Sequence, residues 1–312
     1  MLNEVIAPAN LRLGFARVEA SRGMAGVDNV TIGAYRRNLE VNIALLGEEL
    51  HSGRYVPLPL LLLLVAKADG SPRVLSVPAV RDRVAQAAVM NLIEPIFEAH
   101  FEDVSFAYRR GRSVKAAALR IRELRDQGYR FVVKADLDAY FNTIDHDVLF
   151  AKVTAIIRDP EIFNLLKLWV QAEVYDGEQV FVMDKGIPQG AVISPLLANL
   201  FLDELDETLL VRGYKLVRYA DDFVILTKTR PEAEAALELT EEVLTRLHLA
   251  LDNPDTVITD FDKGFKFLGL FFLKDAIFAP FDRPKRGKRV LYMPPPFDLA
   301  AYLAARKSSP GV

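Results

Sequence analysis

Three absences narrow what this sequence can be. It has no cysteine among its 312 residues, which excludes disulfides and thiolate metal sites and fits a reducing cytoplasm. A bilayer-spanning helix needs about 20 apolar residues. The most apolar stretch, residues 58–66 (LPLLLLLVA), is shorter and typical of a buried strand, so we expect no membrane association. The chain also lacks excess positive charge, with a net charge of −3. Because nucleic-acid-binding proteins are usually basic, a phosphate-binding site here must depend on local clusters of Lys and Arg.

The composition that is present is globular, with 51% hydrophobic and 26% charged residues. At this length we expect two subdomains or one elongated domain. Apolar runs joined by short turns predict strand pairs at 58–78 and 215–228, and helical spacing predicts helices at 80–100, 194–211 and 231–248. Strands and helices alternate without regular βαβ units. This pattern indicates an α+β fold, with an antiparallel sheet flanked by helices.

Two acidic segments are candidates for catalysis. Asp221 and Asp222 interrupt the apolar stretch 215–228, and adjacent acids in a buried strand pattern are costly unless they bind a cation or a turn exposes them. The simpler interpretation is a solvated turn. The second segment is 134–141 (KADLDAYF), in which Asp136 ends an apolar strand. An acid at that place is also typical of a helix N-cap.

Carboxylates from separate elements suit nucleotidyl transfer. Two divalent cations can stabilise both the attacking and the leaving oxygen of an in-line phosphoryl transfer. Magnesium prefers hard oxygen ligands, and manganese accepts the same ligands. The segments around Asp136 and Asp221 therefore offer the ligands of such a site, provided that the fold brings their strand ends together.

Between the two acidic segments lies a third motif, residues 186–195 (GIPQGAVISP). With these motifs in this order, the chain resembles the reverse transcriptases of bacteria, in particular the group II intron type, from about residue 14 to about residue 279. Further segments that carry the resemblance are 23–28 (GMAGVD), 81–84 (RDRV), 106–113 (FAYRRGRS) and 267–269 (FLG).

The resemblance implies an RNA-directed DNA polymerase that acts on an RNA template, a DNA or RNA primer and deoxynucleoside triphosphates. It implies that Asp136, Asp221 and Asp222 hold two Mg²⁺ ions, with the backbone carbonyl of Leu137 as a further ligand. It also implies a right-hand architecture with three parts: fingers with an N-terminal extension at 1–130, a palm with the catalytic site at 131–280, and a basic, proline-containing tail at 281–312.

Four residues are implied to bind the incoming nucleotide. Phe141 stands five residues after Asp136, where the family has an aromatic steric gate against the 2′-hydroxyl; otherwise it is a core aromatic. Gln189 matches a position that contacts the nucleotide near its sugar. Lys67 and Arg73 stand on the two arms of the hairpin at 58–78, where the family places cations on the triphosphate. Their alternative role is that of solvated surface charges.

Other residues are implied to contact primer or template. One basic group consists of Arg109, Arg110, Arg112, Lys115, Arg120 and Arg122, and its alternative is an ordinary solvated helix face. The segment 267–269 matches the family's support for the primer end, and its alternative is a core strand. The full set is Arg109, Arg110, Arg112, Tyr219, Phe267, Leu268 and Gly269.

The sequence departs from the group II intron pattern in two places. Asp255, within 249–256 (LALDNPDT), stands where the family has a Lys. Forty residues follow Phe272, so we expect little or no thumb. Segments 280–286 (PFDRPKR) and 291–296 (LYMPPP) instead resemble the short reverse transcriptases of CRISPR systems, which implies an integrase complex as partner and a role in spacer acquisition from RNA.

Two other interpretations stay open. One is another bacterial reverse transcriptase, of the retron, diversity-generating or abortive-infection type; diversity-generating enzymes tend to alter the motif that is intact here at 189–195. The other is a non-catalytic subunit that uses the fold to hold nucleic acid. Loss of a catalytic carboxylate would favour that second interpretation, and all three are present.

Overall fold

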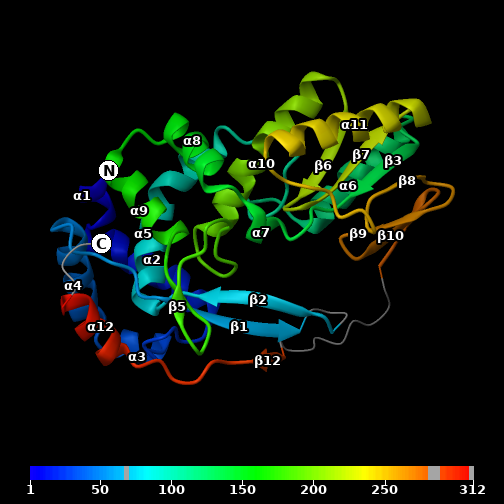
Figure 1. Ribbon diagram of the computed structural model, residues 1–312. Helices are drawn as coiled ribbons and strands as arrows, with labels where there is room; N and C mark the ends of the chain where they lie inside the picture. Colours follow the sequence, from blue (N-terminus) through cyan, green and yellow to red (C-terminus); the bar gives the residue numbers. More distant parts are fainter. Residues whose placement is uncertain (67–69, 280–288, 309–312) are drawn as a thin grey trace. The chain divides into compact units, whose positions relative to one another are not determined.

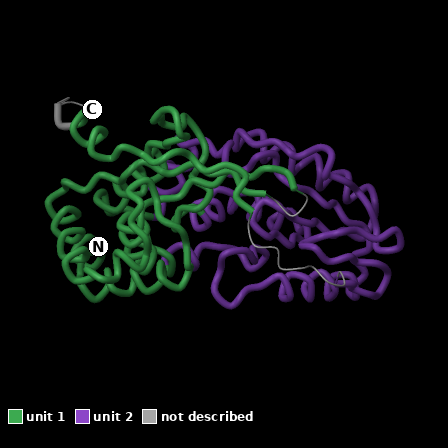
Figure 2. The backbone as a smooth tube through the Cα atoms, turned by 90° about the horizontal axis from the view of Figure 1, so that it is seen from below, with its two compact units in different colours: residues 1–95, 157–194, 286–312 green, residues 96–156, 195–285 purple. Residues whose placement is uncertain are grey.

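The computed structural model describes residues 1–66, 70–279 and 289–308. They form two compact units, each assembled from separate stretches of the chain (Figure 2). Unit 1 contains residues 1–95, 157–194 and 286–312, and unit 2 contains residues 96–156 and 195–285. The predicted fingers, palm and tail are each continuous in sequence, so these two units follow a different division of the chain.

Unit 1 combines helices with a five-stranded sheet (Figure 1). The strands lie in the order β12-β1-β4-β5, and β2 pairs with β1; every pairing is antiparallel except β1 with β4. The strands are β1 (Leu60–Ala66), β2 (Pro72–Val77), β4 (Val174–Tyr175), β5 (Val180–Phe181) and β12 (Val290–Tyr292). The helices are α1 (Leu2–Val5), α2 (Pro8–Ser21), α3 (Ile32–Arg37), α4 (Leu39–His51), α5 (Val80–Glu98), α9 (Pro160–Val170) and α12 (Leu299–Ser308).

The hairpin expected at 58–78 is confirmed as β1 and β2, which pair from Leu61↔Val77 to Ala66↔Pro72. Strand β1 is apolar throughout because it is central: β2 pairs on one side, and β4 and β12 pair on the other. Strand β12 was not expected. It belongs to the segment interpreted as a tail, yet Tyr292 pairs with Leu64, and its hydroxyl donates to the carbonyl of Asp176 at 3.0 Å.

Unit 2 is built on a four-stranded antiparallel sheet in the order β6-β7-β3-β8. Its strands are β3 (Phe131–Ala135), β6 (Lys215–Tyr219), β7 (Asp222–Thr227) and β8 (Val257–Asp260). A second sheet contains β9 (Phe265–Phe267), β10 (Leu270–Leu273) and β11 (Ala276–Phe278). The helices are α6 (Val114–Asp126), α7 (Tyr140–Thr143), α8 (His146–Ile156), α10 (Ser194–Val211) and α11 (Arg230–Arg246).

Helices cover both faces of the four-stranded sheet, which explains why its central strands are almost continuously apolar. Val132, Val217 and Val224 share a buried cluster with Ile121 and other residues of α6. Their neighbours along the strands point to the opposite face because side chains alternate along a strand. On that face α11 packs against β3, β7 and β8 (Figure 1).

The predicted α+β class, with antiparallel pairing flanked by helices, is confirmed. The expected helices at 80–100, 194–211 and 231–248 correspond to α5, α10 and α11. Among the described residues, no helix has the length and apolar character that a bilayer crossing requires.

Candidate active site

Asp136 follows directly after β3, whose last residue is Ala135. Ala135 pairs with Phe223, and in an antiparallel ladder the next residue of one strand lies opposite the preceding residue of the other. The register therefore brings Asp136 to the side of Asp222. Burial, and next the charge of Asp221, raise the pKa of Asp136 to about 6. Leu137 beside it is buried and bridges to Leu251.

Asp221 and Asp222 lie where β6 turns into β7. Tyr219 pairs with Asp222, so the loop consists of Ala220 and Asp221 alone. The predicted strand-turn-strand arrangement is confirmed. Burial, and next the charge of Asp136, raise the pKa of Asp222 to about 7. The three predicted carboxylates are thus close enough to perturb one another.

Two observations show that the carboxylates around Asp136 suit a divalent cation. In the part of the chain that the structure describes, the buried Oδ1 of Asp222 has no hydrogen-bond partner. Carboxylate oxygens of Asp136, Asp252 and Asp255 also lie within 4.8 Å of one another. Hard oxygen donors of this kind are the ligands that Mg²⁺ prefers, so the residues present fit the implied ions.

Asp255, at the position where a Lys was expected, therefore adds negative charge beside Asp136. An ammonium group reaches this edge from a different residue. Lys134 on β3 donates from Nζ to the backbone carbonyl of Asp255 at 3.1 Å, and its charge opposes the rise in the pKa of Asp136.

Of the residues predicted to bind the nucleotide, Phe141 shares unit 2 with the aspartates. It lies on α7, half-buried, with its ring 5.6 Å from that of Tyr140 in an edge-to-face arrangement. Tyr140 is almost completely buried, and its hydroxyl donates to the carbonyl of Ala198 at 2.6 Å. This contact fixes the short helix that carries Phe141.

The remaining nucleotide candidates belong to unit 1. Arg73 is exposed on β2, opposite Val65. Gln189 is half-buried, and its carbonyl accepts a hydrogen bond from the backbone N–H of Ser76 at 2.7 Å. Lys67 lies outside the described residues.

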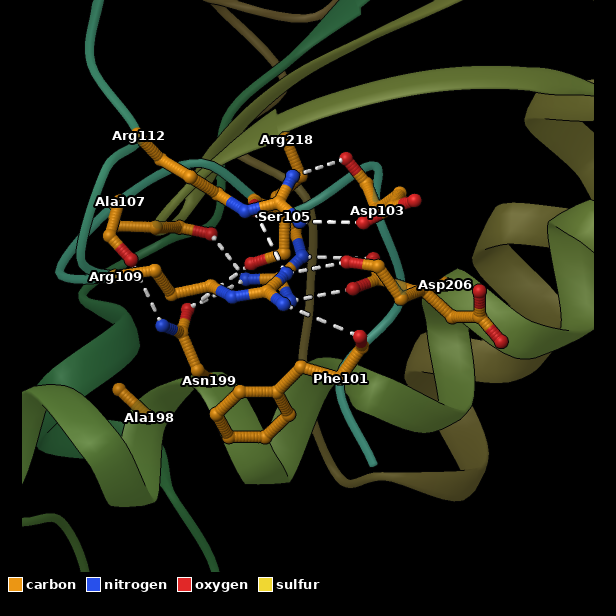
Figure 3. A network of polar contacts seen from close by, with 12 residues as sticks. Phe101, Asp103, Ser105, Ala107, Arg109, Arg112, Ala198, Asn199, Asp206 and Arg218 are labelled. Atoms are coloured by element: carbon orange, nitrogen blue, oxygen red, sulfur yellow. Dashed lines mark hydrogen bonds and ion pairs between the residues drawn. The ribbon is translucent and has the colours of Figure 1, made fainter. Parts of the chain in front are cut away.

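The arginines of segment 106–113 differ in exposure and in bonding. Arg109 does not have the free side chain that the predicted template contact requires. Its side chain is 3% exposed; Nη2 lies 2.8 Å from the carboxylate of Glu98, and the guanidinium also donates to the carbonyls of Phe101 and Ser105 (Figure 3). It is therefore a structural group and not a free cation for template. Arg110 is exposed, and Arg112 is bound to Asp103.

The predicted primer contacts Tyr219, Phe267, Leu268 and Gly269 all lie in unit 2. Tyr219 is half-buried at the end of β6. Phe267 is 2% exposed in the core beneath α6, so its side chain has the alternative role of a core residue. Leu268 and Gly269, with φ of +52° and +75°, form the turn between β9 and β10.

Sequence reasoning missed a group of polar residues beneath the β6–β7 hairpin. Arg218 on β6 and Asp206 on α10 are both completely buried and paired, and Asn199 joins them (Figure 3). The available signal was weak: an arginine within an apolar strand, and several acids on an otherwise apolar helix.

Comparisons with known proteins agree with this geometry. The family model described as reverse transcriptase (RNA-dependent DNA polymerase) matches residues 65–272. Protein YkfC of Escherichia coli strain K12 is 34% identical over 283 residues, which cover 78% of this chain and 74% of that protein. The group II intron-encoded protein LtrA of Lactococcus lactis subsp. cremoris is 34% identical over 172 residues, 55% of this chain and 28% of LtrA. The chain thus spans little more than a quarter of that relative.

Among solved structures, the apo telomerase of Candida tropicalis truncated from its C-terminal domain shares the fold. It matches with a TM-score of 0.57 at 14% identity, over 71% of this chain and 55% of the telomerase. The family match covers two thirds of the sequence and contains the three aspartates predicted to be catalytic, together with Phe141 and Gln189. The chain therefore belongs to the reverse transcriptase family of RNA-directed DNA polymerases, as a group II intron-like member.

Proposed function

We propose that the chain extends a primer on an RNA template by two-metal nucleotidyl transfer, with unit 2 supplying the catalytic groups of a palm. The observation that carries this proposal is the convergence of Asp136, Asp221 and Asp222, with one buried carboxylate oxygen left unbonded. In the reaction the primer 3′-oxygen loses its proton and bonds to the α-phosphorus. The bond from that phosphorus to pyrophosphate breaks.

The residues of unit 2 have different proposed roles. Asp136, Asp221 and Asp222, with the carbonyl of Leu137, would hold the two ions. When bound, divalent cations favour deprotonation of the attacking hydroxyl and neutralise charge on the departing pyrophosphate. Phe141 restricts the space available to a 2′-hydroxyl.

Residues of both units have further proposed roles toward the substrates. Gln189 contacts the nucleotide near its sugar, and Lys67 and Arg73 bind the triphosphate. Arg110 and Arg112 remain the proposed template contacts, and Tyr219, Leu268 and Gly269 the proposed primer contacts.

The test is extension of a DNA primer on an RNA template with deoxynucleotides and Mg²⁺. We expect wild type to extend, and Asp136→Asn to lose roughly 10²–10³-fold in rate while still binding RNA. Asp138→Asn is the matched control, because Asp138 is an exposed acid two residues further on; it should extend like wild type. Asp221→Ala/Asp222→Ala should fail like Asp136→Asn.

Two outcomes would count against the proposal. Extension by Asp136→Asn at the wild-type rate would remove the carboxylates from the chemistry. A wild-type chain that binds primer–template without extending it would favour the non-catalytic interpretation.

We also propose that the enzyme serves CRISPR spacer acquisition from RNA, an antiviral function, together with an integrase complex. The support is the similarity of 280–286 and 291–296 to the reverse transcriptases of those systems; residues 280–288 lie outside the described part of the chain. The test is co-expression with a spacer integrase and sequencing of new spacers. Spacers copied from RNA should appear with wild type and be absent with Asp136→Asn. Their absence with both would favour a retron, diversity-generating or abortive-infection enzyme.

A further inference from the structure

A buried ion pair lies beneath the turn that carries Asp221 and Asp222. Arg218 and Asp206 are both 0% exposed, and their groups meet through two parallel contacts, Nε to Oδ1 at 2.7 Å and Nη2 to Oδ2 at 2.5 Å (Figure 3). Removing two charges from water is expensive, and apolar side chains of similar size often stabilise a core as well or better. The pair therefore calls for an explanation other than stability.

The contacts of the third guanidinium nitrogen, Nη1, indicate a role other than stability. Nη1 of Arg218 donates to Oδ1 of Asn199 at 3.0 Å and to the backbone carbonyl of Ala220 at 3.1 Å. Asn199 is itself fixed, because its amide donates to the carbonyl of Ala107 at 2.9 Å. The arginine thus joins α10 to the first residue of the catalytic turn.

The turn at Ala220 and Asp221 needs contacts that fix its backbone conformation. Ala220 has a φ of +61°, in the left-handed region that glycine adopts easily and residues with a Cβ adopt under strain. Its carbonyl belongs to the peptide unit that joins it to Asp221. The orientation of this peptide unit determines where the side chains of Asp221 and Asp222 point.

We propose that Arg218, held by Asp206 and Asn199, is a positioning residue for catalysis: it fixes the peptide unit between Ala220 and Asp221 and so directs both carboxylates. This inference rests on the proposed function, in which those carboxylates hold the metal ions. In this proposal the ion pair acts in metal binding and turnover, in addition to any contribution to the folding of unit 2.

The first test is Arg218→Lys. A lysine keeps the charge next to Asp206, but a single ammonium cannot reproduce the planar fork that also reaches Asn199 and Ala220. We expect kcat to fall roughly 10- to 100-fold, since small displacements of reacting groups have effects of this size. Mn²⁺ affinity, measured by titration calorimetry without nucleotide, should fall several-fold, and the Kd for primer–template should stay within about two-fold.

Arg125→Lys is the matched control. Arg125 is also a buried arginine of unit 2, and its guanidinium bonds a carboxylate of Asp126 and the carbonyl of Lys274 at 3.0 Å. Among the described residues, the hydrogen-bond partners of its guanidinium are Asp126 and Lys274, and neither belongs to the turn at 220–221. This variant should keep the wild-type kcat and Mn²⁺ affinity, whatever it does to thermal stability.

A second variant separates positioning from folding, should Arg218→Lys fail to fold. Arg218→Met/Asp206→Leu replaces the pair by apolar groups, which should leave the palm folded, but it removes the donor to Ala220. We expect a thermal transition like that of wild type together with the same losses in kcat and Mn²⁺ affinity. A double variant with both quantities at the wild-type level would overturn the proposal.

The two proposals fail in different ways. If Asp136→Asn is inactive and the Arg218 variants match wild type, the carboxylates act as proposed and the positioning role is wrong. If Asp136→Asn is as active as wild type, the proposed function itself is wrong.

Discussion

Replacing Gly190 by alanine should damage unit 1 more than an ordinary glycine substitution. Gly190 has a φ of +123°, and a Cβ at this position would lie 2.9 Å from the carbonyl oxygen of Ser76. Strand β2 and the turn at 189–190 cannot easily move apart, because the backbone N–H of Ser76 donates to the carbonyl of Gln189 at 2.7 Å. A strained backbone costs about 1–3 kcal/mol, and an overpacked contact costs a further ~1–3 kcal/mol. We therefore expect Gly190→Ala to lower the free energy of unfolding by roughly 2–6 kcal/mol.

Gly53→Ala is the control, because it introduces the backbone strain without the contact. Gly53 follows α4 with a φ of +68°, and nothing lies within 4 Å of a Cβ built there. Its replacement should cost only the left-handed conformation, about 1–2 kcal/mol. Both glycines share unit 1 with Trp169, the single tryptophan, which is buried and donates from Nε1 to Tyr55.

The assay is urea unfolding followed by the fluorescence of Trp169, with the Kd for primer–template and the KM for deoxynucleotide measured on the same variants. Gly190→Ala should also raise the KM, because it displaces Gln189, whereas Gly53→Ala should leave it unchanged. Equal losses of stability in the two variants would refute the reasoning, since the contact with Ser76 would then have no effect.

Three further predictions follow from other parts of the molecule. Phe141→Ala should reduce the preference for deoxynucleotides over ribonucleotides by roughly 10–100-fold, the size of effect that pocket contacts of this kind have; unchanged kcat/KM ratios would exclude a steric gate. Burial raises the pKa of Asp82 to about 6, so the folded chain binds its proton more tightly than the unfolded chain. Stability from this group is present below about pH 4 and lost as the pH rises through 6. Relative to Asp82→Asn, wild type should lose roughly 2–3 kcal/mol between pH 4 and pH 7, and parallel profiles in urea unfolding would contradict this. Asp255→Asn removes a negative charge beside Asp136, and such a charge contributes about 1 kcal/mol at 4 Å in water. The Mg²⁺ concentration for half-maximal extension should therefore rise about five-fold. An unchanged Mg²⁺ titration would show that the charge of Asp255 does not act on the ions.

The sequence predicts elements well where the signal is local. The hairpin β1–β2, the helices α5, α10 and α11, and the turn at Asp221 follow from periodicity and short turns. The proximity of Asp136, Asp221 and Asp222 follows from a motif and its order, and their catalytic role stays a prediction. Strand β12 could not be predicted in this way, because its partner β1 is more than 200 residues away and a three-residue strand has no period of its own.

Charge patterns were less informative because they do not show which side chains are buried. The run of arginines in 106–113 indicated a phosphate-binding or solvated surface, yet Arg109 is enclosed by carbonyls and Glu98. Helix α10 carries Asp203 and Asp206 on an apolar background. Only the tertiary structure shows that Asp206 meets an arginine from a strand, whereas Oδ1 of Asp203 is buried without a partner among the described residues.

The catalytic hairpin and helix α10 beneath it thus carry two kinds of carboxylate, which differ in the partners that the protein supplies. Both oxygens of Asp206 are bonded to the guanidinium of Arg218, so this acid needs nothing from outside the chain. Asp222, in the part of the chain that the structure describes, keeps a buried oxygen without a donor, close to two further acids. An unpaired buried carboxylate is costly, and a cation is the partner that removes this cost. Unit 2 therefore provides partners for Asp206, which fixes Arg218, and leaves a buried oxygen of Asp222 without one among the described residues. This is the arrangement that the proposed metal-dependent mechanism requires.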